Sequence, residues 1–374
     1  MGIGNNSYII SLKYSPGLWK EFTLMGERLR THDVSVRYLI SKKYANIGPA
    51  HSGTQYVTSS DRVATILKDV ILFNSLKKNI LSIFSQSPPK YTCFYNPHPL
   101  NPILCYLIKK YYPDSIISLY LHDPFKPDKS HYGMVKSFYI RIVDLVQSKT
   151  VKCCDYIISP SDYSAKLFNQ RYPKFKGINI VAPLLVPDGE HQNRNKRIYF
   201  SIVGTAHQAT GHDTFVRLIN YVAEKDFPFK FAIISSSNID SFLNVISEKG
   251  KRLLTVINKS IITDQEINNI ISQSLAVFRF DKEVTQSGVV PVCYMNATPV
   301  IARDIPGLRQ HVEHKGNGYL VPYACTPSEI IEAMAFVSAN ISVLKTNARR
   351  SYETIWASDN FDKYYDWLIQ SLNR

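Results

Sequence analysis

The sequence has few cysteines, and none of them belongs to a recognisable motif. The six cysteines among 374 residues form no C-x-x-C pair, and no Cys/His cluster has zinc-site spacing. The sequence therefore gives no indication of a metal site, and its cysteine usage is typical of a reducing cytosol. Cys153 and Cys154 are adjacent, and we predict that both are core thiols.

Long apolar runs are also lacking. No uninterrupted apolar stretch reaches the length that a membrane-spanning helix needs. The first residues contain no basic segment followed by an apolar core, so we expect no signal peptide. Asn6 departs from the myristoylation pattern. We therefore expect a cytoplasmic protein whose membrane contact, at the inner face of the cell membrane, is peripheral.

Acidic residues are scarce relative to basic ones. Lys and Arg total 44 against 30 Asp and Glu, which gives a formal net charge of +14. Such a charge attracts nucleic acid, anionic lipid or phosphorylated small molecules, although a solvated basic surface explains it equally well. Because no nucleic-acid reading motif is present, we expect no nucleic-acid partner.

Length and hydrophobic pattern indicate two α/β domains. A chain of this length is too long for one ordinary core, and its 45% apolar content is typical of a globular protein. Short β-rich runs alternate with helical patterns in both halves, which predicts two doubly wound parallel sheets. Residues 183–197 are polar with two prolines and are typical of a linker.

The expected elements follow this alternation. In the first half we predict strands at 7–12, 34–40, 92–95, 115–121 and 156–159, and a helix at 18–30. In the second half we predict strands at 197–203, 229–235, 253–256, 275–280 and 299–302. Helices are expected at 212–224, 264–274, 289–295, 327–338 and 343–356, and an amphipathic aromatic segment at 361–372.

A first candidate phosphate site follows the strand that ends at Val203. Gly204 lets a phosphate approach the backbone, and Gly211 precedes a helix whose N-terminal N–H groups can bind an anion. The spacing is not that of a dinucleotide fingerprint. Taken alone, an ordinary turn between strand and helix is the better explanation.

The segment 277–322 is the most informative. Gly288 opens a predicted helix, and the residues around it offer side-chain donors and backbone N–H groups for a diphosphate. Positive charge lies nearby, and Glu283 has the chemistry to bind sugar hydroxyls. A capped helix with Ser287 as the cap is the alternative. The candidate residues here are Arg279, Lys282, Glu283, Thr285, Gln286, Ser287, Gly288 and Val289.

Three runs in this segment resemble the donor domain of retaining glycosyltransferase family four. They are Thr298-Pro-Val-Ile-Ala302, Asp304-x-Pro-Gly-Leu308 and Gly316-Asn-Gly-Tyr-Leu-Val-Pro322. Upstream, Gln286-Ser-Gly-Val-Val290 is similar to a diphosphate-binding helix start in a subgroup of that family. The resemblance is looser in the first half, at Leu29-x-x-His32-Asp-Val34 and Ser159-x-Ser161-x-Tyr163-Ser164.

The resemblance implies a GT-B fold with a site between two Rossmann-like domains. An acceptor domain would span 1–182, a linker 183–197 and a nucleotide-sugar domain 198–355. The segment 356–374 would cross back onto the first domain. The resemblance also implies a nucleotide-sugar donor such as a UDP- or GDP-sugar, no metal, and no cofactor beyond the donor.

The sequence departs from the family pattern at four positions. Val284 and Val292 stand where the family has paired glutamates, and Thr205 and Thr210 stand where it has a phosphate-binding Arg and Lys. Glu283 lies beside the first of these positions and is expected to substitute. Because a diphosphate leaving group needs its charge neutralised, Arg279, Lys282, His207 or His212 would have to supply cations.

In the first half, His122 follows a predicted strand and is our main candidate. The family often has a histidine in this loop facing the donor sugar, and Asp123 would orient it. A histidine capping a turn is the alternative. Gly17 lies where the family has a glycine-rich loop beside the acceptor, and Lys126 could meet an acceptor phosphate. The basic amphipathic stretch 131–152 either contacts an anionic membrane or has one core face and one solvated face.

The sequence thus predicts a glycosyltransferase that acts with retention on a saccharide or lipid-linked acceptor. The expected setting is the synthesis of a bacterial surface polysaccharide. Because several motif positions are altered, a non-catalytic GT-B scaffold that binds a partner transferase is the alternative.

Overall fold

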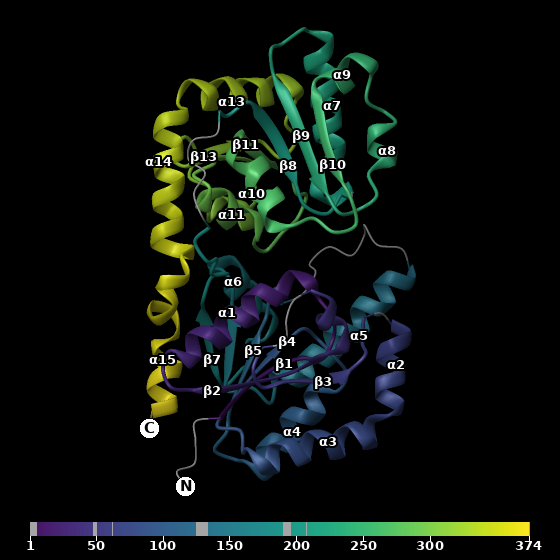
Figure 1. The fold of residues 1–374 in the computed structure, drawn as a ribbon, viewed down its shortest axis with the longest axis vertical. Helices are drawn as coiled ribbons and strands as arrows, with labels where there is room; N and C mark the ends of the chain where they lie inside the picture. Colours follow the sequence, from purple (N-terminus) through teal and green to yellow (C-terminus); the bar gives the residue numbers. More distant parts are fainter. Residues whose placement is uncertain are drawn as a thin grey trace. The chain divides into compact units, whose positions relative to one another are not determined.

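The computed structural model describes residues 6–47, 51–61, 63–124, 134–189, 196–206 and 208–373. The chain forms two compact units (Figure 1). The first comprises Met1–Pro183 and Phe361–Arg374, and the second comprises Leu184–Asn360. Lys126 and His207 lie outside the described residues.

The first unit is built on a seven-stranded parallel sheet with the order β3-β2-β1-β4-β5-β6-β7. The order reverses between β1 and β4, so the loops that follow these strands diverge and leave room for a ligand. The strands are β1 (Asn6–Ser11), β2 (Ser35–Ser41), β3 (Thr54–Thr58), β4 (Tyr91–Tyr95), β5 (Ile116–Tyr120), β6 (Tyr156–Ser159) and β7 (Ile178–Val181).

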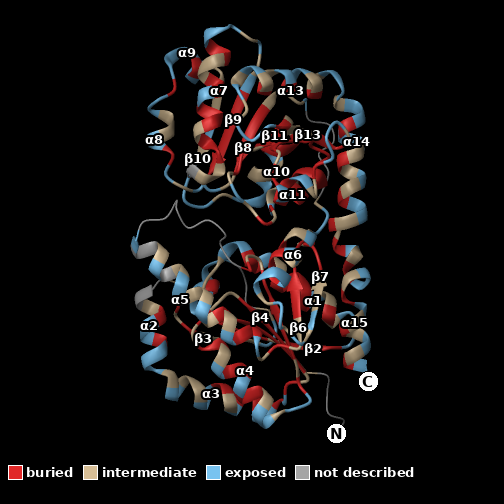
Figure 2. Ribbon diagram, turned by 180° about the vertical axis from the view of Figure 1, so that it is seen from behind, coloured by how far each residue is buried: buried red, intermediate tan, exposed pale blue. Residues whose placement is uncertain are grey.

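Helices cover both faces of this sheet (Figures 1 and 2). Phe84, Leu104 and Phe168 bring α3, α4 and α6 onto one face, whereas Phe22 and Leu368 come from the helices on the other. The helices are α1 (Trp19–Arg30), α2 (Val63–Ile71), α3 (Phe73–Gln86), α4 (Asn101–Tyr111), α5 (Met134–Val151), α6 (Asp162–Arg171) and α15 (Phe361–Asn373).

The final helix, α15, belongs to the first unit although it follows the second along the chain. The ring of Trp367 stacks on Tyr156 with centroids 4.2 Å apart, and Asp362 Oδ1 lies 2.8 Å from His32 Nε2. Its apolar side, which includes Leu368 and Leu372, is fully buried. The aromatic segment predicted to need a hydrophobic surface therefore finds it on the first sheet.

The second unit has a six-stranded parallel sheet with the order β10-β9-β8-β11-β12-β13. Successive residues Val277 and Phe278 enter different cores, as expected for a strand covered on both faces. The strands are β8 (Tyr199–Val203), β9 (Lys230–Ser235), β10 (Leu254–Asn258), β11 (Ser274–Arg279), β12 (Val300–Arg303) and β13 (Gly318–Val321).

Helices α7 and α13 cover one face of this sheet, and α10, α11 and α14 cover the other. Thr263 and Thr326 form capping boxes that fix the starts of α10 and α13. The helices are α7 (His212–Glu224), α8 (Asp240–Leu243), α9 (Glu248–Arg252), α10 (Asp264–Ser272), α11 (Val289–Met295), α12 (Pro306–Arg309), α13 (Pro327–Ala339) and α14 (Ile341–Ser351), which a π-helical turn, Tyr352–Trp356, extends.

The prediction of two doubly wound parallel sheets is confirmed. Three strands were not predicted: β3 and β7, which form the edges of the first sheet, and β13, an edge of the second. Residues 184–189, predicted as linker, lie in the second unit, where Arg349 bonds both carboxylate oxygens of Asp188. Cys153 is partly exposed, so only Cys154 of the adjacent pair is a core thiol.

A buried hydrogen-bonded cluster ties the loops after β3 and β4 to helix α2 in the first unit. Ser60 Oγ donates to Asp69 Oδ2 at 2.5 Å and lies 3.0 Å from His98 Nε2. The Leu100 N–H donates to His98 Nδ1 at 3.2 Å. Because the Ser60 proton goes to Asp69, His98 Nε2 must donate, which makes the imidazole neutral. Burial lowers the pKa of His98 to about 4.

We expect the first unit to lose stability in mild acid. His98 has an ordinary pKa of 6.5 when unfolded and about 4 when folded, so the unfolded chain binds more protons in that window. Stability is therefore full above pH 6.5 and falls by roughly 3 kcal/mol as the pH drops to 4. Urea unfolding between pH 7 and 4.5 measures the slope. His98→Gln should flatten it, whereas His32→Gln, at a partly exposed histidine, should not.

Candidate functional site

Three predicted donor-site residues meet at the point where the strand order of the second sheet reverses. β8 and β11 are neighbours there, and Gly204 and Arg279 lie at their carboxyl ends. Gly204 has a φ of +117°, and a Cβ at this position would lie 3.9 Å from Arg279 Nη1 and 4.0 Å from Val289 Cγ2. Parallel α/β sheets bind ligands at such reversal points.

The guanidinium of Arg279 is already paired. Its Nη2 donates to Asp281 Oδ1 at 2.9 Å and its Nη1 to the Val203 carbonyl at 3.3 Å. The side chains are 11% and 5% exposed, so little water screens the pair. Asp281, which the sequence analysis did not name, therefore offsets part of the positive charge that Arg279 was expected to add.

Lys282 shows the same pattern. Its Nζ lies 3.6 Å from Asp213 Oδ2, and its backbone N–H donates to the Ala209 carbonyl at 2.9 Å. The backbone bond joins the loop after β11 to the loop after β8. Arg279 and Lys282 are thus each matched by a carboxylate, and their electrostatic attraction for a diphosphate is weaker than the sequence predicted.

The Gln-Ser-Gly-Val stretch follows as a loop into α11. Ser287 is buried, and its Oγ accepts the Val289 N–H at 3.3 Å, so this amide is partly engaged within the chain. Gly288 is the N-cap residue and is exposed, which corrects the reading of Ser287 as the cap.

The remaining predicted residues of this unit differ in exposure. Thr205 and Glu283 are exposed, Gln286 is half-buried, and Thr285 is buried. His212 is 1% exposed, with Nδ1 3.0 Å from Thr210 Oγ1, so it is a poor candidate for a phosphate cation.

Residues in and next to the family-like motifs pack against the loop that precedes α11. A Cβ on Gly307 would collide with the Val284 carbonyl oxygen, so only glycine lets the two backbones pack. Gln310 Nε2 donates to the Thr285 carbonyl at 2.9 Å. Thr298 Oγ1 accepts from Arg197 at 2.7 Å, at the opposite end of the sheet. Gly307 and Gln310 therefore position the loop, whereas Thr298 does not.

In the first unit, His122 follows β5 and pairs with Glu21 from α1. Nε2 of His122 lies 3.0 Å from Glu21 Oε2, and the side chains are 24% and 11% exposed. Burial opposes the charged imidazole, but Glu21 and, more weakly, Asp123 together raise the pKa of His122 above its usual value. The sequence reading named Asp123 as the orienting carboxylate; Glu21 makes that contact.

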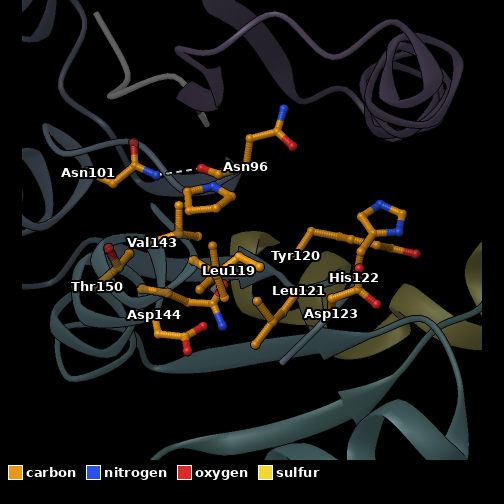
Figure 3. A pocket seen from close by; sticks show the side chains of 13 residues that line it. Asn96, Asn101, Leu119, Tyr120, Leu121, His122, Asp123, Val143, Asp144 and Thr150 are labelled. Carbon is orange, nitrogen blue, oxygen red and sulfur yellow. Dashed lines mark hydrogen bonds between the residues drawn. The ribbon is translucent and has the colours of Figure 1, made fainter. Parts of the chain in front are cut away.

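A cavity of about 230 Å³ lies at the carboxyl ends of β4 and β5 (Figure 3). Asp123 lines it, while the His122 ring is turned away from Asn101 and Thr150. Asn101 Nδ2 donates to the Asn96 carbonyl at 2.7 Å and fixes one wall. The polar side chains that line this cavity are those of Asn96, Asn101, Tyr120, His122, Asp123, Asp144, Gln147 and Thr150.

Gly17 is exposed in a short 3-10 turn, and a Cβ there would meet no atom within 4 Å. Its geometry therefore gives no steric reason for a glycine. Within the described part of the chain, no group of His, Cys, Asp and Glu side chains could hold a metal ion. None of the described helices has the length and apolar character needed to cross a membrane.

Comparison with known proteins gave matches among solved structures only. No protein-family model and no curated protein matches the chain. Sucrose-phosphate synthase from Thermosynechococcus elongatus is similar, with a TM-score of 0.72 and 13% identity over 98% of this chain and 99% of that one. The pneumococcal O-GlcNAc transferase GtfA, in complex with UDP and GlcNAc, has a TM-score of 0.71 and 10% identity over 99% of both chains.

A third similar structure is WaaG, a glycosyltransferase involved in lipopolysaccharide biosynthesis. Its TM-score is 0.66 at 10% identity, over 98% of this chain and 99% of that one. At such identities the similarity concerns the fold. The chain therefore has the GT-B fold found in glycosyltransferases, as the sequence resemblance predicted.

We expect Gly307→Ala to destabilise the second unit by about 1–3 kcal/mol, because the added methyl group overlaps the Val284 carbonyl. Gly17→Ala is the matched control, since its methyl group has open space, and should leave stability unchanged. Urea unfolding of both variants at neutral pH makes the comparison. Equal midpoints for Gly307→Ala and the unmodified protein would contradict the packing role.

Proposed function

We propose that this chain is a cytoplasmic glycosyltransferase that moves a sugar from a nucleotide-sugar donor to a saccharide or lipid-linked acceptor with retention. The observation that carries the proposal is the meeting of Gly204, Arg279 and Val289 at the reversal point of the second sheet, within a GT-B fold. Titration with UDP- and GDP-sugars, followed by product analysis with membrane extract as acceptor, tests it.

The donor diphosphate binds against the open backbone at Gly204. Arg279 is the cation nearest this backbone, and the exposed Gly288 adds a main-chain N–H. Asp281 offsets part of the Arg279 charge and turns the guanidinium toward the strand ends, which orients the cation while weakening its attraction. Glu283 is exposed and can bind hydroxyls of the donor. No metal takes part in this proposal.

His122 and Glu21 serve the reaction from the first unit. The Glu21 carboxylate favours the protonated imidazole, and in this proposal the His122 ring donates a hydrogen bond to the sugar. In the transfer step the acceptor hydroxyl attacks the anomeric carbon and the bond to the diphosphate oxygen breaks. The hydroxyl proton passes to the departing phosphate, so no separate protein base is needed.

The similar structures support this choice of substrates. The pneumococcal transferase holds UDP and GlcNAc, and WaaG acts in lipopolysaccharide biosynthesis. A UDP-sugar donor and a role in surface polysaccharide synthesis are therefore the first to test. The polar lining of the first unit's cavity, with its amides, hydroxyls and carboxylates, suits the hydroxyl groups of a saccharide acceptor.

A scaffold without catalytic activity is the second candidate, and specific observations favour it. Arg279 is neutralised by Asp281, and Lys282 by Asp213. Val284 and Val292 occupy the places of the family's glutamates. A protein with this site could bind a partner transferase while giving no calorimetric response to any common sugar nucleotide.

Replacing both members of the buried ion pair by neutral residues should distinguish a transferase from a scaffold. Arg279→Gln with Asp281→Asn removes the cation without leaving an unpaired charge, so the fold should be kept. For a transferase, we expect donor affinity to fall about tenfold, as for the loss of one charge-assisted contact. Calorimetry with UDP-sugars measures the affinity. His122→Ala should instead retain donor binding and lose turnover. Unchanged binding in the double variant would remove Arg279 from the site.

Peripheral contact with an anionic membrane is part of the proposal, and exposed apolar side chains of α5 and α2 support it. Met134 is 91% exposed, Phe138 67% and Ile71 83%. Lys68 and Arg141 are exposed on the same helices. Apolar groups flanked by cations are typical of an interfacial surface.

We expect phosphatidylglycerol vesicles to co-sediment with the protein. Ile71→Ser with Phe138→Ser should reduce the bound fraction severalfold, because each removes apolar area from the bilayer contact. Ile261→Ser with Val343→Ser is the matched control, since both residues are exposed on the second unit at 77% and 61%. Equal losses in the two double variants would argue against this surface.

A further inference from the structure

The first unit contains a second, larger cavity of about 550 Å³. It is formed by the end of α5, the end of α6 and the loops that lead into β6 and β7. Because the sheet is parallel, these segments lie at the amino ends of the strands, whereas His122 follows the carboxyl end of β5. The cavity is therefore on the opposite edge of the sheet from the proposed catalytic groups.

Four basic residues and no acidic residue line this cavity. They are Lys152, Arg171, Lys174 and Lys176, all exposed. The neighbouring Asp155 carboxylate is already engaged, since Oδ2 accepts from Lys109 Nζ at 2.7 Å and from the Ile117 N–H at 2.8 Å. The cavity rim is consequently positive without a matching carboxylate in its lining.

Helix ends explain only part of this charge. Lys152 follows the last residue of α5 and Arg171 is the last residue of α6, where a cation offsets the negative end of the helix dipole. Lys174 and Lys176 lie beyond α6 in the loop to β7 and have no helix end to offset. Their placement on the same cavity indicates an anionic ligand.

The cavity walls are apolar and held in place by the loop's own packing. Phe168 contacts the rings of Tyr172 and Phe175 at centroid distances of 5.0 and 5.3 Å. The Phe175 N–H donates to the Tyr172 carbonyl at 3.0 Å. A Cβ on Gly177 would collide with the Asp155 carbonyl oxygen, which shows how closely the loop packs. The apolar lining also includes Val151 and Pro173.

We propose that this cavity binds a phosphorylated amphiphile, a phosphate or diphosphate group attached to an apolar body. The four cations would hold the phosphate at the rim, and the walls formed by Val151, Tyr172 and Phe175 would cover the apolar part. The volume lies within the range of small-molecule sites. The site is separate from the proposed donor and acceptor sites and does not depend on them.

Calorimetric titration of the full chain with three probes tests the proposal. The probes are geranyl diphosphate, inorganic pyrophosphate and geraniol, which carry both features, the anion alone and the apolar body alone. We expect geranyl diphosphate to bind most tightly. Lys174→Glu with Lys176→Glu should weaken it about tenfold or more by turning attraction into repulsion. Ser148→Trp, which fills the cavity, should weaken geranyl diphosphate and spare pyrophosphate.

Two controls make the outcome specific. Lys110→Glu with Lys166→Glu changes the net charge equally at exposed positions outside the lining, and should leave affinity nearly unchanged. The Arg279→Gln, Asp281→Asn protein should still bind geranyl diphosphate, whatever becomes of donor binding. Loss of the signal in that protein would assign it to the second unit and overturn the proposal. Equal affinity for pyrophosphate and geranyl diphosphate, or equal losses in the two lysine pairs, would overturn it as well.

Discussion

The buried ion pair of Arg279 and Asp281 constrains the donor site proposed for the second unit. It lies between β8 and β11, where the strand order reverses and the loops that follow the two strands diverge. The pair also reaches β8 through the Val203 carbonyl, so the cation cannot leave without losing two contacts. An incoming diphosphate must therefore share Arg279 with a carboxylate that is already in place.

In each unit a carboxylate lies beside a basic side chain of the proposed site. In the second, a carboxylate offsets a cation beside an open glycine; in the first, Glu21 stabilises the charged form of His122. Both arrangements hold a positive group in a fixed orientation in surroundings with little water. Fixed dipoles and charges of this kind contribute to catalysis because they need little reorganisation during the reaction. Their cost is a weaker attraction for the substrate in its ground state.

Much of the fold follows from the sequence, while the electrostatics of the site follow only in part. The bounds of α7 and α11 match the prediction because apolar periodicity and a preceding glycine define them locally. The edge strands β3 and β7 have few fully buried residues, so their hydrophobic signal is weak. The contact between Glu21 and His122 depends on α1 packing beside β5, which no local pattern encodes. The pairing of Arg279 with Asp281 had a signal, since alternate residues of an extended chain point the same way.

The net charge of +14 illustrates why composition is a poor guide to a binding site. The cations nearest the reversal point of the second sheet are matched by Asp281 and Asp213, so the excess charge is not concentrated there. The larger cavity of the first unit, in contrast, is lined by basic residues and by no carboxylate. With Arg279 and Lys282 paired, selection at the proposed donor site must depend on geometry. A sugar nucleotide would be recognised there by its shape and hydrogen bonds more than by its charge.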